Sequence, residues 1–412
     1  MLNILRGALA LTVVEGLGLV LAIVTLPHLM RTLGPDGFGK FAFGIAACAL
    51  VSMVVDHGFN QLGPKLVARL PESGLDRARL FWSVQVAKAQ LGLMAMAGVL
   101  VLAWTVGLDT TYGGVLTVAG LGALASLSFP QWFLQGSLRL RTLAKAQSLA
   151  RILVAAAQLT FVQSPGDILL AVVLQAGLGV AAGILALSDE SYRTAIKWQR
   201  TGIAQGWSLL RQANGLFLSN LAVSSYTTAV PLVVGALTSP TTLGLFSAGD
   251  KIRAAVQSLL TPLGTAAFPY FSLWMKEDRT RGLCAARRIL AVQLGAALLG
   301  CGAIALGAEP VILLLVGETF IDAVPVAQLL GLCIVCTAIS NTLGMQVMLA
   351  LDMERTFVAI LTGCAAIGIG MTALFAMRWQ QMGAAFAVLS TEALVAGIMA
   401  LVLWHGGVWR SR

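Results

Sequence analysis

The stretch FVAILTGCAAIGIGMTALFAM, from Phe357 to Met377, has no charged side chain and is bounded by Arg355 and Arg378. An apolar run of about 20 residues is the length that an α-helix needs to cross the hydrocarbon core of a bilayer. Elsewhere in the chain the charged residues gather into short clusters between similar apolar stretches. The stretch therefore predicts a membrane-spanning helix, and the rest of the chain predicts several more.

The composition supports this prediction. Of the 412 residues, 58% are hydrophobic and only 11% are charged, whereas about a quarter of the residues in a soluble domain are charged. The net charge of +9 comes from basic residues beside apolar stretches, which argues against nucleic-acid binding. Cys333 and Cys336 have no second pair and no nearby histidines, so we expect packing cysteines and neither a metal site nor a cofactor.

The apolar runs predict an all-α polytopic membrane protein. Glu15 and the lack of a small-residue cleavage site argue that the first run is a membrane helix and not a signal peptide. Twelve spans are expected near residues 3–26, 38–57, 80–106, 112–135, 144–163, 167–188, 207–236, 242–272, 287–307, 323–350, 356–377 and 382–404.

The basic residues of the predicted loops indicate the orientation of the chain. They concentrate on one side, in the intervals 65–79, 139–145, 193–200 and 276–288 and at Arg355, Arg410 and Arg412. On the other side the prediction places only Arg31, Lys40 and Arg378. Since cytoplasmic loops carry the excess of Lys and Arg, both termini are expected in the cytoplasm.

The longest polar interval, Ser188 to Gln205, divides the chain into two halves that enter the membrane from the same side. The expected domains are an N-terminal six-helix bundle over 1–190, a cytoplasmic linker over 191–205 and a C-terminal six-helix bundle over 206–412. Such halves are parallel repeats. The pattern G-x-F-x-x-G occurs in both, at 39–44 and at 244–249, each time after a proline, Pro27 or Pro231, that is expected to close the preceding helix.

Three short blocks carry further information. The block LPHLMRTLGPDGFG at 26–39 has the residues of a tight turn, with Asp36 placed to cap the next helix. The block DHGFN at 56–60 precedes Lys65 and Arg69, and we expect Asp56 to be a cap or a partner of one of them. The block PQWFLQG at 130–136 is followed by Arg151.

Together these blocks resemble the polysaccharide transporter family, the O-antigen and exopolysaccharide flippases of the multidrug/oligosaccharidyl-lipid/polysaccharide exporter superfamily. The resemblance covers the first 150 residues well. It implies about 12 transmembrane helices in two six-helix bundles around a central cavity that opens alternately to each side. It also implies a polyprenyl-diphosphate-linked oligosaccharide, moved from the cytoplasmic to the periplasmic leaflet of a bacterial inner membrane by ion-gradient coupling, with membrane lipids, a polysaccharide polymerase and other assembly proteins as partners.

Charged residues inside the predicted spans are candidates for the site, because a charge at the centre of a membrane helix costs about 2.5 to 3.5 kcal/mol on insertion scales. The candidates for binding the diphosphate or the sugars are Lys88, Arg151, Lys251, Arg253, Gln131 and Gln135. The candidates for ion coupling are Glu15, Glu392 and Asp250.

The basic candidates have structural alternatives. Asp250 and Arg253 are three residues apart on one helix face and can simply neutralise each other. Lys251 points about 100° away from Asp250, lacks a local partner and is the strongest candidate for a cation in the cavity. The side chains of Lys88 and Arg151 can instead reach the headgroups from near the cytoplasmic end of their spans.

The acidic and amide candidates also leave alternatives open. Glu15 and Glu392 can form interhelical ion pairs with the cations, or can be protonated inside the bundle. Ser128, Gln131 and Gln135 recur on one face of the fourth predicted span, and they can bind a sugar beside Trp132 or hydrogen-bond to another helix.

The chain contains none of the sequence motifs of an ATP-driven pump or a metalloprotease, so we expect a transporter and not an enzyme. One rival is a drug exporter of the same superfamily, in which acids and aromatics would dominate the cavity. A membrane glycosyltransferase or polymerase would need large periplasmic loops, whereas most of the predicted outer loops have fewer than about fifteen residues.

The charge asymmetry predicts that a reporter which fluoresces only in the cytoplasm will glow when it is fused after Arg412. A dark fusion that is stably expressed and membrane-inserted would reverse this orientation. Fluorescence of intact cells, compared with the fusion level on an immunoblot, separates the two outcomes.

Overall fold

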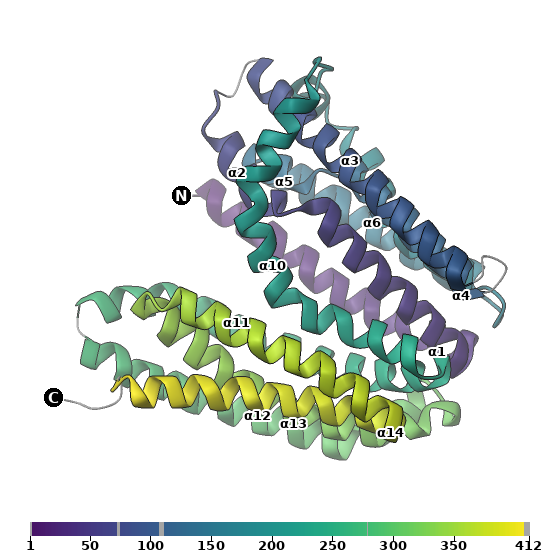
Figure 1. Cartoon of the computed structure of the whole chain (residues 1–412), viewed down its shortest axis with the longest axis vertical. Helices are drawn as coiled ribbons and strands as arrows, with labels where there is room; N and C mark the ends of the chain where they lie inside the picture. Colours follow the sequence, from purple (N-terminus) through teal and green to yellow (C-terminus); the bar gives the residue numbers. More distant parts are fainter. Residues whose placement is uncertain (1, 72–74, 107–110, 278, 408–412) are drawn as a thin grey trace. The chain divides into compact units, whose positions relative to one another are not determined.

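The computed structural model describes residues 2–71, 75–106, 111–277 and 279–407, and these residues form helices, turns and loops with no strand. Arg410 and Arg412 lie outside the described residues. The elements are α1 Leu2–Asp56, α2 Phe59–Ala68, α3 Leu75–Val106, α4 Thr111–Ala125, η1 Ser126–Ser128, α5 Gln131–Gly136, α6 Leu140–Phe161, α7 Ile168–Ala176, α8 Leu178–Ala186, α9 Glu190–Ala195, α10 Ile203–Leu237, α11 Pro240–Glu277, α12 Arg279–Leu315, η2 Glu318–Ala323, α13 Val324–Asn341, η3 Thr342–Met348, η4 Leu349–Leu351 and α14 Glu354–His405 (Figure 1).

The predicted fold class is confirmed. Among the described residues, seven helical stretches are long and apolar enough to cross a membrane. The helices α1 and α14 each contain two of the expected spans, since α1 is broken at Gly34 and α14 at Trp379 and Gln380. An arrangement of about twelve spans is therefore compatible with the structure.

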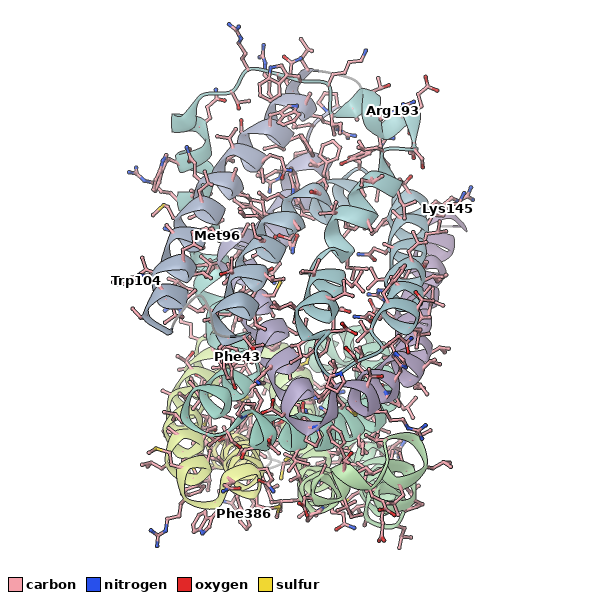
Figure 2. All side chains as sticks on the ribbon, turned by 90° about the vertical axis from the view of Figure 1, so that its right-hand side faces the viewer. Phe43, Met96, Trp104, Lys145, Arg193 and Phe386 are labelled. Carbon is pink, nitrogen blue, oxygen red and sulfur yellow. The ribbon has the colours of Figure 1, made fainter. Side chains whose placement is uncertain are left out.

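Large apolar side chains cover much of the outer surface of the helices. Trp104 is 75% exposed and Leu306 is 85% exposed, and Figure 2 shows Trp104 and Phe386 at the surface. In water such a surface would be unfavourable, whereas in a bilayer it contacts lipid chains.

Two prolines do not end their helices, contrary to the prediction. Helix α1 continues past Pro27 to a break at Gly34, where φ is 66° and ψ is 177°. Helix α10 continues past Pro231 to Leu237. A proline removes only one backbone donor, and neighbouring groups in a membrane bundle can compensate for that loss. The break falls on Gly34, because glycine reaches positive φ without steric cost. Beyond the break, the carboxylate of Asp36 pairs with the ammonium group of Lys40 at 2.7 Å.

The fourth predicted span is not one continuous helix. Helix α4 ends at Ala125, and a break at Phe129 and Pro130 separates η1 from the short helix α5. The backbone of α8 approaches this break closely, since a Cβ atom added to Gly183 would lie 2.3 Å from the carbonyl oxygen of Ser128. The prediction that all three polar residues share one helix face was therefore wrong for Ser128, whereas Gln131 and Gln135 lie four residues apart on α5.

The chain forms two compact units, residues 1–221 and residues 222–412. The division falls inside α10, whereas the polar interval places the linker at 191–205. The two criteria differ because polarity marks where a chain leaves the membrane and packing marks the bundle that a helix joins. The first part of α10 packs within the first unit, where Gly206 lies against Ala87 of α3.

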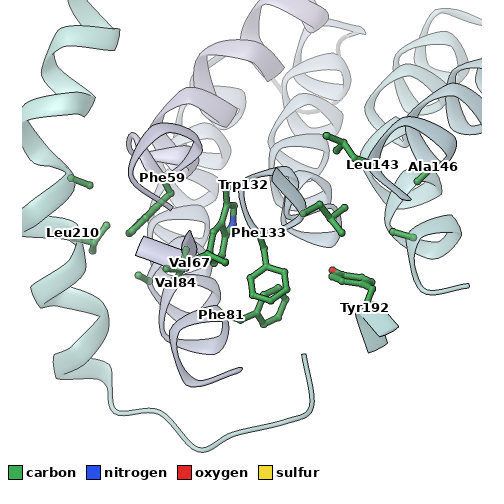
Figure 3. Packing of buried hydrophobic residues seen from close by; sticks show 14 residues of the cluster. Phe59, Val67, Phe81, Val84, Trp132, Phe133, Leu143, Ala146, Tyr192 and Leu210 are labelled. Carbon is green, nitrogen blue, oxygen red and sulfur yellow. The ribbon is translucent and has the colours of Figure 1, made fainter. Parts of the chain in front are cut away.

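The core of the first unit is an aromatic cluster at one end of the bundle (Figure 3). Trp132 and Phe133 of α5 are completely buried, with ring centroids 6.1 Å and 5.1 Å from that of Phe81. Tyr192 of α9 packs on the same cluster at 6.2 Å from Phe133. Trp132 is thus a core residue and not the exposed stacking surface that the sequence suggested.

The connection after α8 is fastened to this core. Asp189 caps α9 by accepting hydrogen bonds from the backbone nitrogens of Ser191 and Tyr192 at 2.9 Å and 3.2 Å. Hydrogen bonds from the hydroxyls of Ser191 and Thr142 lower the pKa of Asp189 to about 2. Trp82 donates from its indole nitrogen to the carbonyl oxygen of Ile196 at 3.1 Å. These contacts hold the segment that leads to α10.

The repeated G-x-F-x-x-G pattern has a common structural role in both units. The last glycine of each copy permits close helix packing, because a Cβ atom at Gly44 would lie 2.6 Å from Val115 of α4 and one at Gly249 would lie 2.8 Å from Val326 of α13. The phenylalanines of the two copies, Phe41 and Phe246, are both buried. Close contact through small residues is the usual way in which membrane helices associate.

In the second unit, α11, α12, α13 and α14 run side by side (Figure 1). Helix α13 leads into η3, a π-helical segment in which Thr342 and Gln346 are buried. Gly344 of this segment lies against Phe357 and Met399 of α14. The four helices therefore bring polar residues of α11, α13 and α14 within reach of one another.

We predict that Gly63→Ala destabilises the first unit by about 1 to 3 kcal/mol, because the added methyl group would overpack the core. A Cβ atom at Gly63 would lie 2.4 Å from the Cε3 atom of Trp132, whereas nothing lies within 4 Å of the matching position at Gly98. Gly98→Ala is the control, since both changes bring the same helix preference of about 1 kcal/mol. Thermal unfolding in detergent measures the difference, and equal melting temperatures would contradict the packing of Trp132.

Candidate functional site

Lys88 in α3 has a carboxylate partner that the sequence did not reveal. Its ammonium nitrogen lies 2.5 Å from the Oδ1 atom of Asp56 at the end of α1, and the residue is only 3% exposed. The amide of Asn60 donates to the other carboxylate oxygen. The prediction that Asp56 is a cap or pairs with Lys65 or Arg69 was wrong, because the partner comes from a helix that is distant in sequence.

Arg151 in α6 lies against the first half of α1. Its Nη1 atom donates to the backbone carbonyl of Val14 at 2.7 Å, and its Nη2 atom lies 3.9 Å from Glu15. Gly18 makes room for the guanidinium, since a Cβ atom there would lie 2.4 Å from Nη1. Among the alternatives that the sequence left open, the structure thus contains the interhelical pair of Glu15 and Arg151.

The two glutamine candidates are less buried than the aromatic residues Trp132 and Phe133 that lie between them in the sequence. Gln131 accepts a hydrogen bond from the amide of Gln147 in α6 at 3.2 Å. Gln131 and Gln135 are both partly buried on α5. The contact between Gln131 and Gln147 is the helix-to-helix hydrogen bond that was the structural alternative to a sugar contact.

In the second unit, Arg253 is held by two residues of its own helix. Its Nε and Nη2 atoms lie 2.8 Å and 2.7 Å from the Oδ1 atom of Asp250, and its Nη1 atom donates to Gln257. Only 19% of its side chain is exposed. The structure therefore shows neutralisation within α11, and Gln257 is a member of the candidate site that the sequence analysis missed. Its spacing of four residues from Arg253 was the available signal.

Glu392 of α14 belongs to the same group of residues. It is 8% exposed and interacts electrostatically with Arg253 and with the thiols of Cys333 and Cys336 on α13. We call Asp250, Arg253, Gln257 and Glu392 the α11–α14 cluster. It contains two carboxylates and one guanidinium.

Lys251 lies beside this cluster in sequence but not in its packing. Its side chain is exposed, in contrast to Arg253 two residues later. In the described part of the chain no hydrogen bond or ion pair holds its ammonium group. Its role as a cation of a cavity stays a prediction.

No group of three or more His, Cys, Asp or Glu side chains suited to a metal ion occurs among the described residues. Lys88, Arg151 and Arg253 instead form ion pairs with carboxylates. Such an arrangement can hold and release an anion or a proton.

Comparison with other proteins identifies the family of this chain. Residues 4–275 match the family described as polysaccharide biosynthesis protein, a match that covers more than half of the chain. An Escherichia coli (strain K12) protein with the provisional name O-antigen transporter is 27% identical over 402 residues, 97% of this chain and 96% of the relative. A Shigella dysenteriae protein with the same provisional name is 26% identical over 272 residues, 65% of this chain and 67% of the relative.

Two solved structures share the fold. One is the lipid II flippase MurJ in an inward closed conformation, with a TM-score of 0.73 and 12% identity over 97% of this chain and 87% of that chain. The other is an inward-facing multidrug resistance transporter of the MATE family of the MOP superfamily, with a TM-score of 0.68 and 13% identity over 95% of this chain and 99% of that chain. The resemblance in the three sequence blocks is thus confirmed: the chain is a multi-pass membrane protein that belongs to the polysaccharide biosynthesis protein family.

Proposed function

We propose that this chain is a flippase that moves a polyprenyl-diphosphate-linked oligosaccharide from the cytoplasmic to the periplasmic leaflet of a bacterial inner membrane. The full-length relative is named as an O-antigen transporter, and one protein with the same fold is a lipid II flippase. Both kinds of cargo combine sugars with a lipid. Transport by alternating access requires no covalent step, which agrees with relatives that are named as transporters.

The observation that carries the proposal is the Arg253 guanidinium inside membrane helices, paired with Asp250 and Gln257. Two phosphates stripped of water need charged donors, and a planar guanidinium can bind their oxygens with two parallel hydrogen bonds. In this structure the carboxylate of Asp250 is paired with the guanidinium. A diphosphate, which carries more charge and more acceptor oxygens, competes for the same donors.

The α11–α14 cluster also suggests how transport is coupled to an ion gradient. When a diphosphate takes Arg253, the carboxylate of Asp250 loses the guanidinium with which it is paired, and the buried Glu392 loses the favourable field of that cation. Withdrawal of a positive charge raises the cost of an ionised acid at low exposure, so uptake of a proton or another cation becomes more favourable. Asp250 and Glu392 are therefore the proposed coupling residues, while Glu15, whose side chain is 78% exposed beside Arg151, has a structural role.

The second candidate function is drug export, because a multidrug resistance transporter of the MATE family has the same fold. A site that binds organic cations would contain acidic residues, and the α11–α14 cluster contains two, Asp250 and Glu392. The central guanidinium of Arg253 opposes that use, since it repels a cation from the same place. A flippase for an anionic lipid headgroup fits the charges better.

We predict that Arg253→Lys lowers the rate of flipping about tenfold or more, because loss of one charge-assisted hydrogen bond is worth about 1.5 to 3 kcal/mol. Lys251→Ala should also lower the rate if its exposed ammonium group meets the same headgroup. Arg288→Lys, an exposed arginine of α12 changed in the same way, is the control.

The measurement follows a fluorescent polyprenyl-diphosphate oligosaccharide across the bilayer of proteoliposomes that contain the purified chain. Wild-type protein without any acceleration would refute the flippase. Wild-type protein that transports a lipophilic organic cation but not the glycolipid would establish the drug exporter in its place.

A separate prediction concerns coupling. Glu392→Gln keeps the shape and hydrogen bonding of the side chain but removes its titration, so binding of the glycolipid should persist while acceleration by an imposed pH gradient is lost. Glu15→Gln is the matched comparison, and we expect it to retain the acceleration. If Glu15→Gln loses it and Glu392→Gln does not, coupling resides in the first unit. A wild type that ignores the gradient would remove proton coupling altogether.

A further inference from the structure

Helix α10 is attached to the first unit along one face. Asn214, Phe217 and Asn220 recur at intervals of three residues. Asn214 and Phe217 contact His57 between α1 and α2, and Asn220 contacts Gln61 of α2. The Nε2 atom of His57 lies 2.7 Å from the Oδ1 atom of Asn214, and the His57 ring stacks on Phe217 with centroids 4.3 Å apart. The amide of Gln61 donates to the Oδ1 atom of Asn220 at 3.0 Å. We call these contacts the α10 attachment.

The turn that makes this attachment has an unusual backbone. His57 and Gly58 both have positive φ, 44° and 79°. A Cβ atom at Gly58 would lie 3.1 Å from both the Cβ atom of Leu216 and the backbone nitrogen of Phe217, so only glycine allows α10 to come this close. A histidine in the left-handed region persists only where its surroundings hold it there, and such residues are found at sites that switch.

The residue immediately before this turn is Asp56, the partner of Lys88. The buried ammonium group of Lys88 at 2.5 Å and the amide of Asn60 hold the two carboxylate oxygens. The ion pair with Lys88 thus holds Asp56, the last residue of α1. Helix α10 holds the next residue, His57. A change in the charge around Asp56 acts directly on His57 through the peptide bond between them.

Beyond Leu221, α10 belongs to the second unit. The helix itself runs from Ile203 to Leu237, so it continues beyond the residues that make the α10 attachment.

We propose that the turn of Asp56, His57 and Gly58 transmits the charge state of Lys88 to α10, so that a diphosphate group which takes Lys88 from Asp56 loosens the α10 attachment. The inference rests on the proposed function for the identity of the anion. Asp56 then keeps only Asn60 as a partner, and its carboxylate must turn toward water or another donor. The turn loses the support for its left-handed residue, and α10 is released from His57. The ammonium group of Lys88 thus positions α10 through the turn that contains His57.

Hydrogen exchange of the full chain in nanodiscs, read by mass spectrometry, tests the transmission without any ligand. Lys88→Met imitates the loss of the cation, and exchange of amides in residues 210–221 should rise about tenfold, which corresponds to 1.4 kcal/mol. Exchange in α6 should stay unchanged. Lys65→Met, an exposed lysine of α2, is the control and should leave α10 at the wild-type rate.

The double variant Lys88→Met with Asp56→Asn separates transmission from simple loss of packing. It removes the unpaired charge while the methionine still lies at the position of Lys88, so exchange in 210–221 should return toward the wild-type rate. If the double variant exchanges as fast as Lys88→Met, or if Lys88→Met leaves α10 unchanged, the inference is wrong.

A second arm uses farnesyl diphosphate, with farnesol as the uncharged comparison. The diphosphate should raise exchange in 210–221 of the wild type and add nothing in Lys88→Met. If it protects amides elsewhere but leaves α10 unchanged, this inference fails and the proposed function stands. If it changes no part of the chain and the proteoliposomes also show no flipping, the proposed function fails together with it.

Discussion

The pairing of charges inside an apolar bundle is the constraint on which the rest of this structure depends. An ammonium or carboxylate group at membrane depth is costly unless a partner offsets its charge. The ion pair of Lys88 and Asp56 satisfies this requirement between α3 and the end of α1. Because the pair fixes where these two helices meet, it also determines where the turn after α1 can contact α10.

The helices can bring these groups together because small residues line their contacts. Gly18 accommodates the guanidinium of Arg151, and Gly63 accommodates the ring of Trp132. Gly44 and Gly249 likewise make room for side chains of neighbouring helices, Val115 of α4 and Val326 of α13. In lipid there is no hydrophobic force that drives helices together, so close packing and polar contacts supply the association.

The two units differ in the arrangement of their charges. In the first unit Lys88 is paired with Asp56 and Arg151 with Glu15, each time across two helices. In the second unit Arg253 is paired with Asp250 on its own helix and interacts electrostatically with Glu392 of α14. In the proposed mechanism the second arrangement is the one that exchanges an ion when the diphosphate binds.

The sequence by itself determined the class of the molecule. Apolar runs such as Phe357 to Met377, separated by charges, require membrane helices whatever their packing, and the blocks at 26–39, 56–60 and 130–136 indicated the family. It also located the residues that needed partners, among them Lys88, Arg253 and Glu392. These conclusions follow from local composition and spacing, which do not depend on how the chain folds back on itself.

Only the tertiary structure decided which groups meet. The partner of Lys88 lies 32 residues away, and Trp132 is buried because α5 is folded under Gly63 and beside Phe81. The break at Phe129 and Pro130, and the continuation of α1 past Pro27, likewise depend on whether neighbouring helices satisfy the freed backbone groups. Partners such as Asp56 for Lys88 come from other helices, and helical spacing describes a single helix, so no period in the sequence could reveal them.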